Sequence, residues 1–245
     1  MSNELPVAIV TGASRGIGAA VAKRLAQDGF AVVVNYATNE KEALNLVEEI
    51  TWAGGQATAI QADVSNPLAV AELFEQAEST FAAPSVLVNS AGIMHLSPLA
   101  ECSDESFQSM MDVNVKGTFN TLRQAANKLQ KGGRIINLST SVLGLSLPTY
   151  AVYSATKAAV EAMTTIFAKE LRGRSITVNA VAPGPTATAL FFKGKSKAQI
   201  EQLTKMTPLE RLAEPEDIAN TVSFLAGADG GWINGQILRA NGGIV

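Results

Sequence analysis

Short runs rich in β-branched residues alternate with helix-forming stretches almost to the C-terminus, and this alternation restricts the fold more than any other feature. It is typical of a parallel sheet covered by helices on both faces. The expected strands are residues 7–11, 30–35, 57–61, 86–89, 134–139, 176–181 and 236–239. The helices expected between them are residues 19–28, 41–52, 68–81, 116–131, 152–172 and 216–226. The sequence therefore predicts a single α/β domain over residues 1–245, built on a doubly wound sheet of seven parallel strands.

The composition supports one well-packed domain and a small-molecule function. Hydrophobic residues make up 47% of the chain and charged residues 17%, which provides enough apolar material for a sizeable core and differs from the composition of disordered chains. The formal net charge is -3, whereas proteins that bind nucleic acid through its phosphates usually present a basic face. We therefore expect a small-molecule partner and no nucleic acid.

The sequence lacks several features that are typical of secreted, membrane-bound or metal-binding proteins. Cys102 is the single cysteine, so no intrachain disulfide can form and no thiolate metal site is expected. Residues 1–6 contain no basic cluster ahead of the short apolar run 7–10, unlike a secretory signal. No segment approaches the roughly 20 apolar residues of a membrane span. We expect a cytoplasmic protein with no metal and no membrane anchor.

A glycine-rich turn joins the first expected strand to the first expected helix. Residues 11–18 read TGASRGIG, and glycines there permit a tight turn whose backbone approaches a pyrophosphate at the helix N-terminus. The spacing is GxxxGxG, and alone it also fits an ordinary tight turn. Its position at the start of a parallel α/β chain favours dinucleotide binding and a Rossmann-like fold. The expected contacts are Gly12, Ser14, Arg15, Gly16, Ile17 and Gly18.

The end of the second strand indicates which dinucleotide is bound. An acidic residue about 20 positions on normally binds the adenosine ribose of NAD, but this chain has Asn35, Tyr36 and Ala37 there. No carboxylate is placed to repel a 2′-phosphate, and Arg15 can provide a guanidinium for it. We therefore predict NADP(H) as the cofactor. Two alternatives stay open: Arg15 is an ordinary solvated side chain, or Glu40 reaches a ribose.

Tyr153 and Lys157 lie four residues apart, which places a phenol and an ammonium on one face of the expected helix. The spacing alone is weak evidence, because a half-buried ring beside the stem of a lysine is common. Their position after the fifth expected strand, in a chain that opens with a dinucleotide turn, favours a proton-handling pair. A free tyrosine has a pKa of about 10, and an adjacent cation lowers it. We therefore expect Lys157 to lower the pKa of Tyr153, so that the phenol exchanges a proton with the substrate oxygen.

The chain resembles the short-chain dehydrogenase/reductase family over essentially its whole length, because six separated motifs agree in order. They are the turn at 11–18, Asp63 with Val64, the strand end Asn89, Ser90, Ala91 and Gly92, then Asn114, the Tyr153 and Lys157 set with a preceding hydroxyl, and Pro183 and Gly184 with Thr188. The resemblance implies hydride transfer between nicotinamide and a carbonyl or alcohol carbon. It also implies cofactor contacts from Asp63, Val64, Asn89, Ala91 and Gly92.

The resemblance assigns roles to two residues beside the phenol. Lys157 would also hold the nicotinamide ribose, and Asn114 would anchor a water that relays protons to Lys157. The alternative for Asn114 is a helix-start residue that bonds only to the backbone.

The resemblance also implies a hydroxyl that hydrogen-bonds the reacting oxygen, and three residues compete for this role. The spacing usual in the family gives Thr140, whereas members similar to fungal polyhydroxynaphthalene reductases use a spacing one residue longer, which gives Ser139. Those members also have a proline five residues before the tyrosine, where this chain has Pro148. We therefore prefer Ser139, with Thr140 and Ser141 as rivals.

The residues after the sixth expected strand are expected to meet the nicotinamide and the substrate. The resemblance implies nicotinamide contacts from Pro183, Gly184, Thr186 and Thr188, although an ordinary turn is the alternative. Residues 183–196 form an irregular stretch that is long for an α/β connection, and we expect a lid at 184–206. This segment carries Leu190, Phe191, Phe192, Lys193, Lys195 and Lys197. Its apolar residues suit a hydrophobic substrate and its lysines an acidic carrier or coenzyme, unless the lysines are merely solvated.

These expectations combine into one functional prediction. The chain reduces a carbonyl with NADPH, and a 3-oxoacyl thioester is the first substrate class to test because such reductases are common in this family. Aromatic, quinone or steroid-like ketones are the rival class, and a dinucleotide sensor without activity is a more distant one. His95 is expected to be a pocket wall or surface residue. The resemblance also implies a homotetramer assembled through the helices that carry Asn114 and Tyr153.

Overall fold

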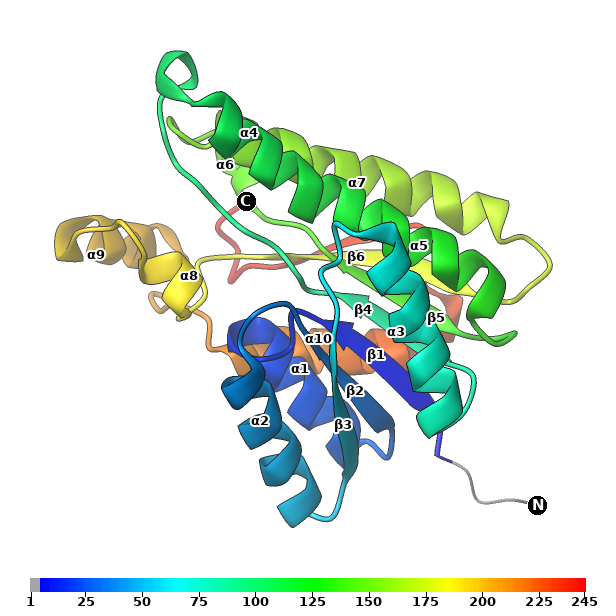
Figure 1. Ribbon diagram of the computed structural model, residues 1–245. Coiled ribbons are helices and arrows are strands. Elements are labelled where there is room, and N and C mark those ends of the chain that lie inside the picture. Colours follow the sequence, from blue (N-terminus) through cyan, green and yellow to red (C-terminus); the bar gives the residue numbers. More distant parts are fainter. Residues whose placement is uncertain (1–4) are drawn as a thin grey trace.

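The computed structural model describes residues 5–245 as a parallel sheet with helices on both faces (Figure 1). The strands are β1 (Val7–Thr11), β2 (Ala31–Tyr36), β3 (Gln56–Gln61), β4 (Val86–Asn89), β5 (Arg134–Leu138), β6 (Thr177–Pro183) and β7 (Ile237–Ala240). The α-helices are α1 (Gly16–Gln27), α2 (Glu40–Trp52), α3 (Pro67–Thr80), α4 (Asp104–Met110), α5 (Gly117–Lys128), α6 (Val142–Leu145), α7 (Ala151–Glu170), α8 (Ala189–Phe192), α9 (Lys197–Met206) and α10 (Pro215–Ala226). The shorter turns are η1 (Leu99–Glu101), η2 (Met111–Lys116) and η3 (Asp229–Trp232). Residues 1–4, part of the N-terminal segment that was compared with a secretory signal, lie outside the described residues.

The strand order creates a crevice at the middle of the sheet. The sheet runs β3-β2-β1-β4-β5-β6-β7, and every neighbouring pair is parallel. The chain moves outward from β1 to β3 and then returns to the other side of β1 with β4. The connections after β1 and β4 therefore leave in opposite directions, which opens a crevice at their carboxyl ends. Thr11 and Asn89 pair at this point, so the glycine turn begins at the crevice.

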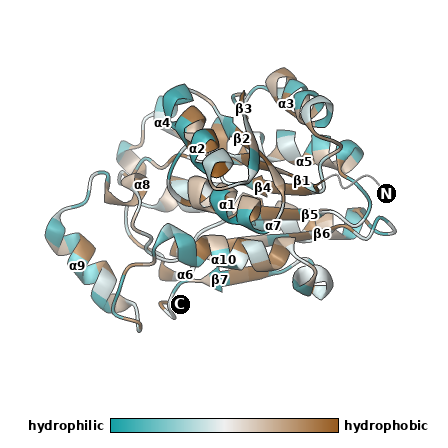
Figure 2. Ribbon diagram, turned by 90° about the horizontal axis from the view of Figure 1, so that it is seen from below, coloured by the Kyte–Doolittle hydropathy of each residue, from teal (hydrophilic) through white to brown (hydrophobic). Residues whose placement is uncertain are grey.

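Two apolar cores cover the faces of the sheet, because side chains alternate along each strand. On β1, Ala8 and Val10 pack toward α1, α2 and α10, whereas Val7 and Ile9 pack toward α3, α5 and α7. Figure 2 shows the hydrophobic colouring of the central strands between these helix layers. Burial on both faces explains why the strands are continuous apolar runs.

The predicted doubly wound sheet of seven strands is confirmed, but the connection between β4 and α5 differs from the prediction. The helix expected at 116–131 is present as α5, but the helix α4 and the π-helical turn η2 that precede it were not predicted. Turns of the π type are rare and are often found at functional sites. Here the turn contains Asn114. Within residues 5–245 no helix has both the length and the apolarity that crossing a membrane requires.

The stretch at 183–196, expected to be irregular, contains the end of β6 and the short helix α8. The side chain of Thr188 starts α8 by accepting a hydrogen bond from the Phe191 backbone at 3.2 Å. Ser196 and Gln199 then form a capping box at the start of α9. Hydroxyl caps satisfy the free N–H groups of a first helical turn, so these polar residues make helices where chain length alone predicted a loop.

Candidate active site

A cavity of about 460 Å³ extends along the carboxyl ends of the strands, from the glycine turn to the 184–206 segment. The expected cofactor contacts that line it are Gly12, Ser14, Arg15, Gly16, Ile17, Gly18, Asn35, Tyr36, Ala37, Asp63, Val64, Ala91, Gly92, Tyr153, Lys157, Pro183, Gly184, Thr186 and Thr188. Asn89 is the one expected contact outside this lining. Motifs that are far apart in the chain therefore meet along one cavity.

The glycine turn provides a cradle that only small residues can form. Gly12 and Gly16 have φ values of 60° and 58°, which side-chain-bearing residues rarely adopt. A Cβ on Gly12 would lie 2.7 Å from the Cα of Ala91, and one on Gly18 would overlap the carbonyl oxygen of Gly12. This close backbone approach, directly before the N-terminus of α1, fits the pyrophosphate of a dinucleotide.

Asn35 stabilises the cradle from behind. Its side chain accepts a hydrogen bond from the Gly12 backbone at 3.3 Å and donates to the carbonyls of Ile60 and Ala62 at 3.2 and 3.0 Å. The side chain is buried, and these bonds join the ends of β2 and β3 to the turn. Asn35 therefore positions the turn, and its amide is already occupied by the protein.

The neighbouring Tyr36 bears on the choice of cofactor. Its phenol donates to the carboxylate of Glu40 at 3.4 Å. Glu40 was the one carboxylate considered for a ribose contact, and its side chain is held by this tyrosine outside the cavity lining. The edge of the cavity next to Arg15 is thus formed by Ala37, Thr38 and neutral neighbours.

Asn89 does not reach the cavity, which corrects the expectation of a cofactor contact. Its amide donates to the Asn137 side chain at 2.9 Å and accepts from the Thr121 hydroxyl at 2.7 Å. All three residues are buried. A side chain at the last position of a strand points to one face of the sheet, and here it points toward α5. Asn89 therefore joins β4, β5 and α5, while the backbone after it faces the cavity.

Tyr153 and Lys157 project from the first two turns of α7 into the centre of the cavity. The Lys157 amine donates to the Leu138 carbonyl at 2.7 Å and lies 6.0 Å from the centre of the Tyr153 ring. This bond ties the start of α7 to the end of β5. The predicted convergence of the two side chains is thus present in the structure.

The ionisation of the pair differs from the expectation that Lys157 lowers the pKa of Tyr153. Burial raises the pKa of Tyr153 to about 12, a rise that a hydrogen bond with Thr140 opposes. Burial also lowers the pKa of Lys157 to about 8. Removing a phenolate or an ammonium from water favours the neutral form of each. At neutral pH the tyrosine is therefore fully protonated, while the lysine is close to its titration range.

Three hydroxyls compete at the end of β5, and the structure brings Thr140 to Tyr153. The Ser139 hydroxyl instead donates to the carboxylate of Glu161 on α7 at 2.6 Å. Ser141 donates to the Ala182 carbonyl at 2.9 Å. All three hydroxyl residues line the cavity, but the two serine hydroxyls are bonded to other partners, which favours Thr140 over the preferred Ser139.

Asn114 lies behind the wall of the cavity, completely buried in the π-helical turn. Its side chain accepts from the Ile93 backbone N–H and donates to the Ile93 carbonyl, both at 2.9 Å, and donates to the Thr156 hydroxyl at 3.1 Å. A Cβ on Gly92 would meet the Asn114 oxygen at 3.4 Å and the Lys157 amine at 3.6 Å. Asn114 therefore fixes the segment after β4 against α7, close to Lys157.

Backbone hydrogen bonds join the chain at the start of the 184–206 segment to the chain that follows its end. Thr186 forms a parallel bridge with Ala213. The backbone N–H of Ala187 donates to Ala213, and that of Ala213 donates to Pro185, both at 2.8 Å. The side chains of Thr186 and Thr188 are used locally, on the Gly184 carbonyl and as the cap of α8. Backbone hydrogen bonds thus hold this part of the cavity rim together.

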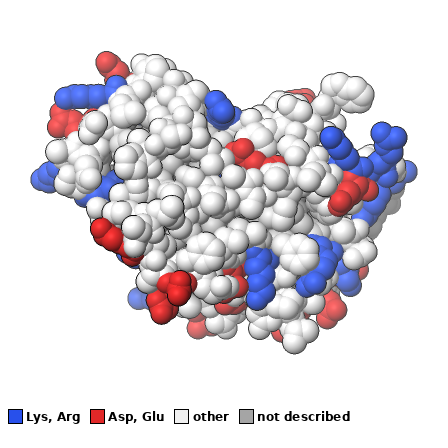
Figure 3. All heavy atoms as spheres, turned by 90° about the horizontal axis from the view of Figure 1, so that it is seen from above, with Lys and Arg blue, Asp and Glu red and all other residues white. Residues whose placement is uncertain are grey.

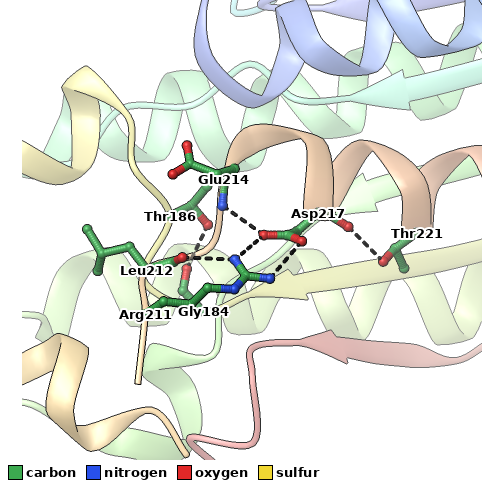
Figure 4. Close-up of polar contacts among 7 residues, drawn as sticks. All are labelled: Gly184, Thr186, Arg211, Leu212, Glu214, Asp217 and Thr221. Carbon is green, nitrogen blue, oxygen red and sulfur yellow. Dashed lines mark hydrogen bonds and ion pairs between the residues drawn. The ribbon is translucent and has the colours of Figure 1, made fainter. Parts of the chain in front are cut away.

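An ion pair fixes the returning end to α10 (Figure 4). Arg211 binds both carboxylate oxygens of Asp217 at 2.6 and 3.0 Å, and Asp217 also accepts from the Glu214 backbone at 2.8 Å. The hydrogen bond from Arg211 lowers the pKa of Asp217. The segment is therefore anchored at the N-terminus of a core helix.

The wall at the substrate end contains residues for which the sequence gave no role. Leu145 and Leu147 come from the connection between β5 and α7, Tyr150 precedes α7, and Leu203 lies on α9. Their signal in the sequence was only a Leu-rich run before the tyrosine. His95 is exposed and outside the cavity lining, which makes it a surface residue.

No group of three or more His, Cys, Asp or Glu residues within 5–245 is arranged to hold a metal.

Known proteins share both the sequence and the architecture. The family model described as enoyl-(acyl carrier protein) reductase matches residues 12–245. An NADPH-dependent aldehyde reductase-like protein of Arabidopsis thaliana is 46% identical, over 98% of this chain and 94% of the relative. The 3-oxoacyl-[acyl-carrier-protein] reductase of Staphylococcus epidermidis is 41% identical, over 97% and 98%. A short-chain dehydrogenase of Burkholderia cenocepacia, solved with NADP, has a TM-score of 0.93 at 34% identity, over 98% of each chain. The chain belongs to the short-chain dehydrogenase/reductase family.

Proposed function

We propose that this enzyme uses NADPH to reduce a carbonyl to a secondary alcohol, with Tyr153 as the proton donor. The observation that carries the proposal is the meeting of Tyr153, Lys157 and Thr140 at the middle of a cavity that begins at the glycine turn. A dinucleotide sensor without activity has no use for a buried phenol beside a buried amine.

The proposed direction of reaction agrees with the ionisation of the site. When bound, NADPH supplies the hydride. Tyr153, with a pKa of about 12, holds its proton at neutral pH and donates it to the substrate oxygen as negative charge develops there. The Thr140 hydroxyl, which touches the phenol, hydrogen-bonds the same oxygen. Lys157 binds the nicotinamide ribose and passes a proton to Tyr153. Asn114 anchors a water that relays protons to Lys157.

The preference for NADP(H) rests on Arg15 at the adenosine end of the cavity. A guanidinium forms strong charge-assisted bonds with a phosphate, and the Glu40 carboxylate is held by Tyr36. The aldehyde reductase-like relative and the Burkholderia structure support the same cofactor. Titration of the protein with NADPH and with NADH tests this point: Arg15→Met should weaken NADPH about tenfold and leave NADH nearly unchanged. Tighter binding of NADH by the unaltered protein would overturn it.

Two substrate classes are supported by different observations. The Staphylococcus relative supports a 3-oxoacyl thioester, whereas the aromatic wall formed by Tyr150 and Phe191 supports an aromatic or quinone ketone. A panel with NADPH that contains an acetoacetyl thioester, a naphthoquinone and an aryl ketone distinguishes them. Turnover of none of these, by a protein that still binds NADPH, would favour the sensor.

We further propose a homotetramer built on the layer of α4, α5 and α7. Phe107, Phe119 and Ile166 are exposed on these three helices, and exposed apolar residues that gather on one face indicate an interface. Figure 3 shows this side of the molecule with a largely uncharged centre and charged groups toward its rim. Light scattering after size exclusion tests the proposal; a monomer at micromolar concentration contradicts it.

We also propose that the chain forms a single domain, that residues 184–206 act as a lid, and that the protein is cytoplasmic. The segment supplies Leu190, Phe191, Lys195 and Leu203 to the cavity lining, which supports its role as a lid over the substrate. Limited proteolysis should cut this segment in the free protein and spare it when cofactor and substrate are bound. Cleavage at an equal rate in both states contradicts a lid.

A further inference from the structure

Lys195 is the one lysine of the lid that contributes to the cavity lining. Its amine donates to the Phe191 carbonyl at 2.7 Å and lies 4.8 Å from the centre of the Phe191 ring and 5.9 Å from that of Tyr150. Lys193 and Lys197 on the same segment are exposed. The structure thus folds one lysine back beneath the lid and leaves its two neighbours in solvent.

The Lys195 amine has unused bonding capacity. An ammonium carries three donors, and one is used by the Phe191 carbonyl. In the part of the chain that the structure describes, none of the ion pairs includes Lys195. Burial lowers its pKa, which reflects the cost of withdrawing a charge from water. The two aromatic rings offset part of this cost, and an anion facing the free donors would offset more.

The residues around the Lys195 amine indicate what kind of substrate would carry the anion. The rings of Tyr150 and Phe191 lie beside the amine, and Leu145, Leu147 and Leu203 line the same cavity. Asp63, at the adenosine end, is the only carboxylate in the cavity lining. Beyond the catalytic Lys157, this part of the cavity therefore combines apolar and aromatic side chains with the positive charge of Lys195.

We propose that Lys195 binds a carboxylate carried by the substrate, so that the preferred substrates are oxo acids with an apolar or aromatic body. This inference rests on the proposed carbonyl reduction and specifies its substrate class. Tyr150 connects the two ends: its ring lies 5.9 Å from the Lys195 amine and 6.5 Å from the Tyr153 ring. These distances limit how far apart the carbonyl and the carboxylate can be, and aromatic oxo acids of different length test which separation fits.

A carboxylate fits this place better than a phosphate. A phosphate group carries up to two charges and is usually held by several cations or backbone N–H groups together. Lys195 is one compact charge among apolar side chains, which matches a monovalent anion. The same geometry makes a neutral ester of the acid a poorer substrate, because it leaves the ammonium unpaired beneath the lid.

Matched substrates and variants test the proposal. The substrates are 4-acetylbenzoate and 3-(4-acetylphenyl)propanoate, each compared with its methyl ester, with NADPH as reductant. We expect a higher kcat/KM for the acids, and Lys195→Met should lower it about tenfold or more for the acids, mainly through KM, with the esters within about twofold. Lys193→Met, on the same segment, is the control and should change neither. Lys195→Arg keeps the charge and should retain the preference for the acids.

A binding measurement separates recognition from turnover. In Tyr153→Phe protein loaded with NADPH, calorimetry should give a Kd for 4-acetylbenzoate that rises about tenfold when Lys195→Met is added. Equal use of acids and esters by the unaltered enzyme would overturn the proposal, as would an equal loss for both in Lys195→Met, which indicates that the lysine only holds the lid. Failure to reduce any carbonyl of the panel would instead overturn the proposed function.

Discussion

The two ends of the cavity are built in different ways. At the cofactor end, backbone and glycines form the surface: Gly12 and Ala91 approach so closely that a single methyl group would not fit between them. At the substrate end, side chains from α7, the connection before it and the lid form the wall, among them Leu147, Tyr150 and Lys195. One end is fixed by local turns at the ends of strands, the other by packing between distant segments.

This difference teaches which changes the enzyme tolerates at each end. Where the surface is backbone, as at Gly12, a substitution alters the turn itself, and Arg15 beside it is a side chain that can be exchanged. A surface made of side chains can change its shape and charge while the sheet stays the same. Variants at the two ends should therefore separate cofactor binding from turnover and from substrate choice.

The largest effect is expected at the junction of the two ends. Tyr153→Phe removes the proton donor and should lower kcat about a thousandfold, while the Kd for NADPH, measured by quenching of its fluorescence, changes less than about twofold. Tyr150→Phe keeps the catalytic phenol and is the control, with a far smaller loss. Substantial activity in Tyr153→Phe would contradict the mechanism.

The next effect concerns the hydroxyl beside the phenol. Thr140→Val should lower kcat/KM about 10- to 100-fold, because a hydrogen bond to the developing oxyanion is lost from a buried site. Ser139→Ala should lower it less than about threefold, since the Ser139 hydroxyl is bonded to Glu161. The opposite ranking of these two isosteric changes would restore Ser139 to the role predicted from the proline spacing.

The cofactor end should respond in binding and not in substrate choice. Gly12→Ala forces a methyl group against the backbone of Ala91, and a clash of this kind costs about 1–3 kcal/mol, so the Kd for NADPH should rise about tenfold. Gly132 also has a positive φ, but a methyl group there would meet no atom within 4 Å. Gly132→Ala therefore carries the same backbone strain without the clash. Equal NADPH affinity in the two variants would show that the cradle is not the pyrophosphate site.

The smallest effect is a pH dependence. Because the pKa of Lys157 is lowered to about 8, its charge is present at lower pH and is lost as the pH rises through this value. The kcat/KM for NADPH, which reports groups of the free enzyme, should be constant on the acid side and fall to about half at pH 8. Tyr153 does not contribute to this limb, because its pKa is raised to about 12. A rate that stays constant to pH 10, with circular dichroism unchanged, would contradict the assignment.

The sheet and the glycine turn could be predicted from the sequence for a physical reason. Strands buried on both faces must be apolar, and the φ values of Gly12 and Gly16 must come from glycines, so both leave local signals in the chain. The spacing of the phenol and amine fits one helical face, but they were predicted as a pair mainly from their position after the fifth expected strand, in a chain that opens with a dinucleotide turn.

The substrate end could be predicted only in part. Which hydroxyl hydrogen-bonds Tyr153 depends on the path of the chain after β5. The candidates Ser139 and Thr140 differ by one position, and their spacing from Tyr153 could not distinguish them. The inward direction of Lys195 depends on contacts with Phe191 and Tyr150, which no local pattern encodes. The rise in the pKa of Tyr153 follows from burial, and burial at this point is produced by segments from several parts of the chain.

The bridge between Thr186 and Ala213 has a consequence for how such an enzyme can be redesigned. Because the two ends of the lid are joined to each other and then anchored by Arg211 and Asp217, the intervening residues form a closed excursion whose length is not dictated by the sheet. The entropy cost of a closed loop grows only slowly with its length. Segments of different length and composition can therefore be grafted between these ends, which makes the proposed lid an exchangeable module on a constant scaffold.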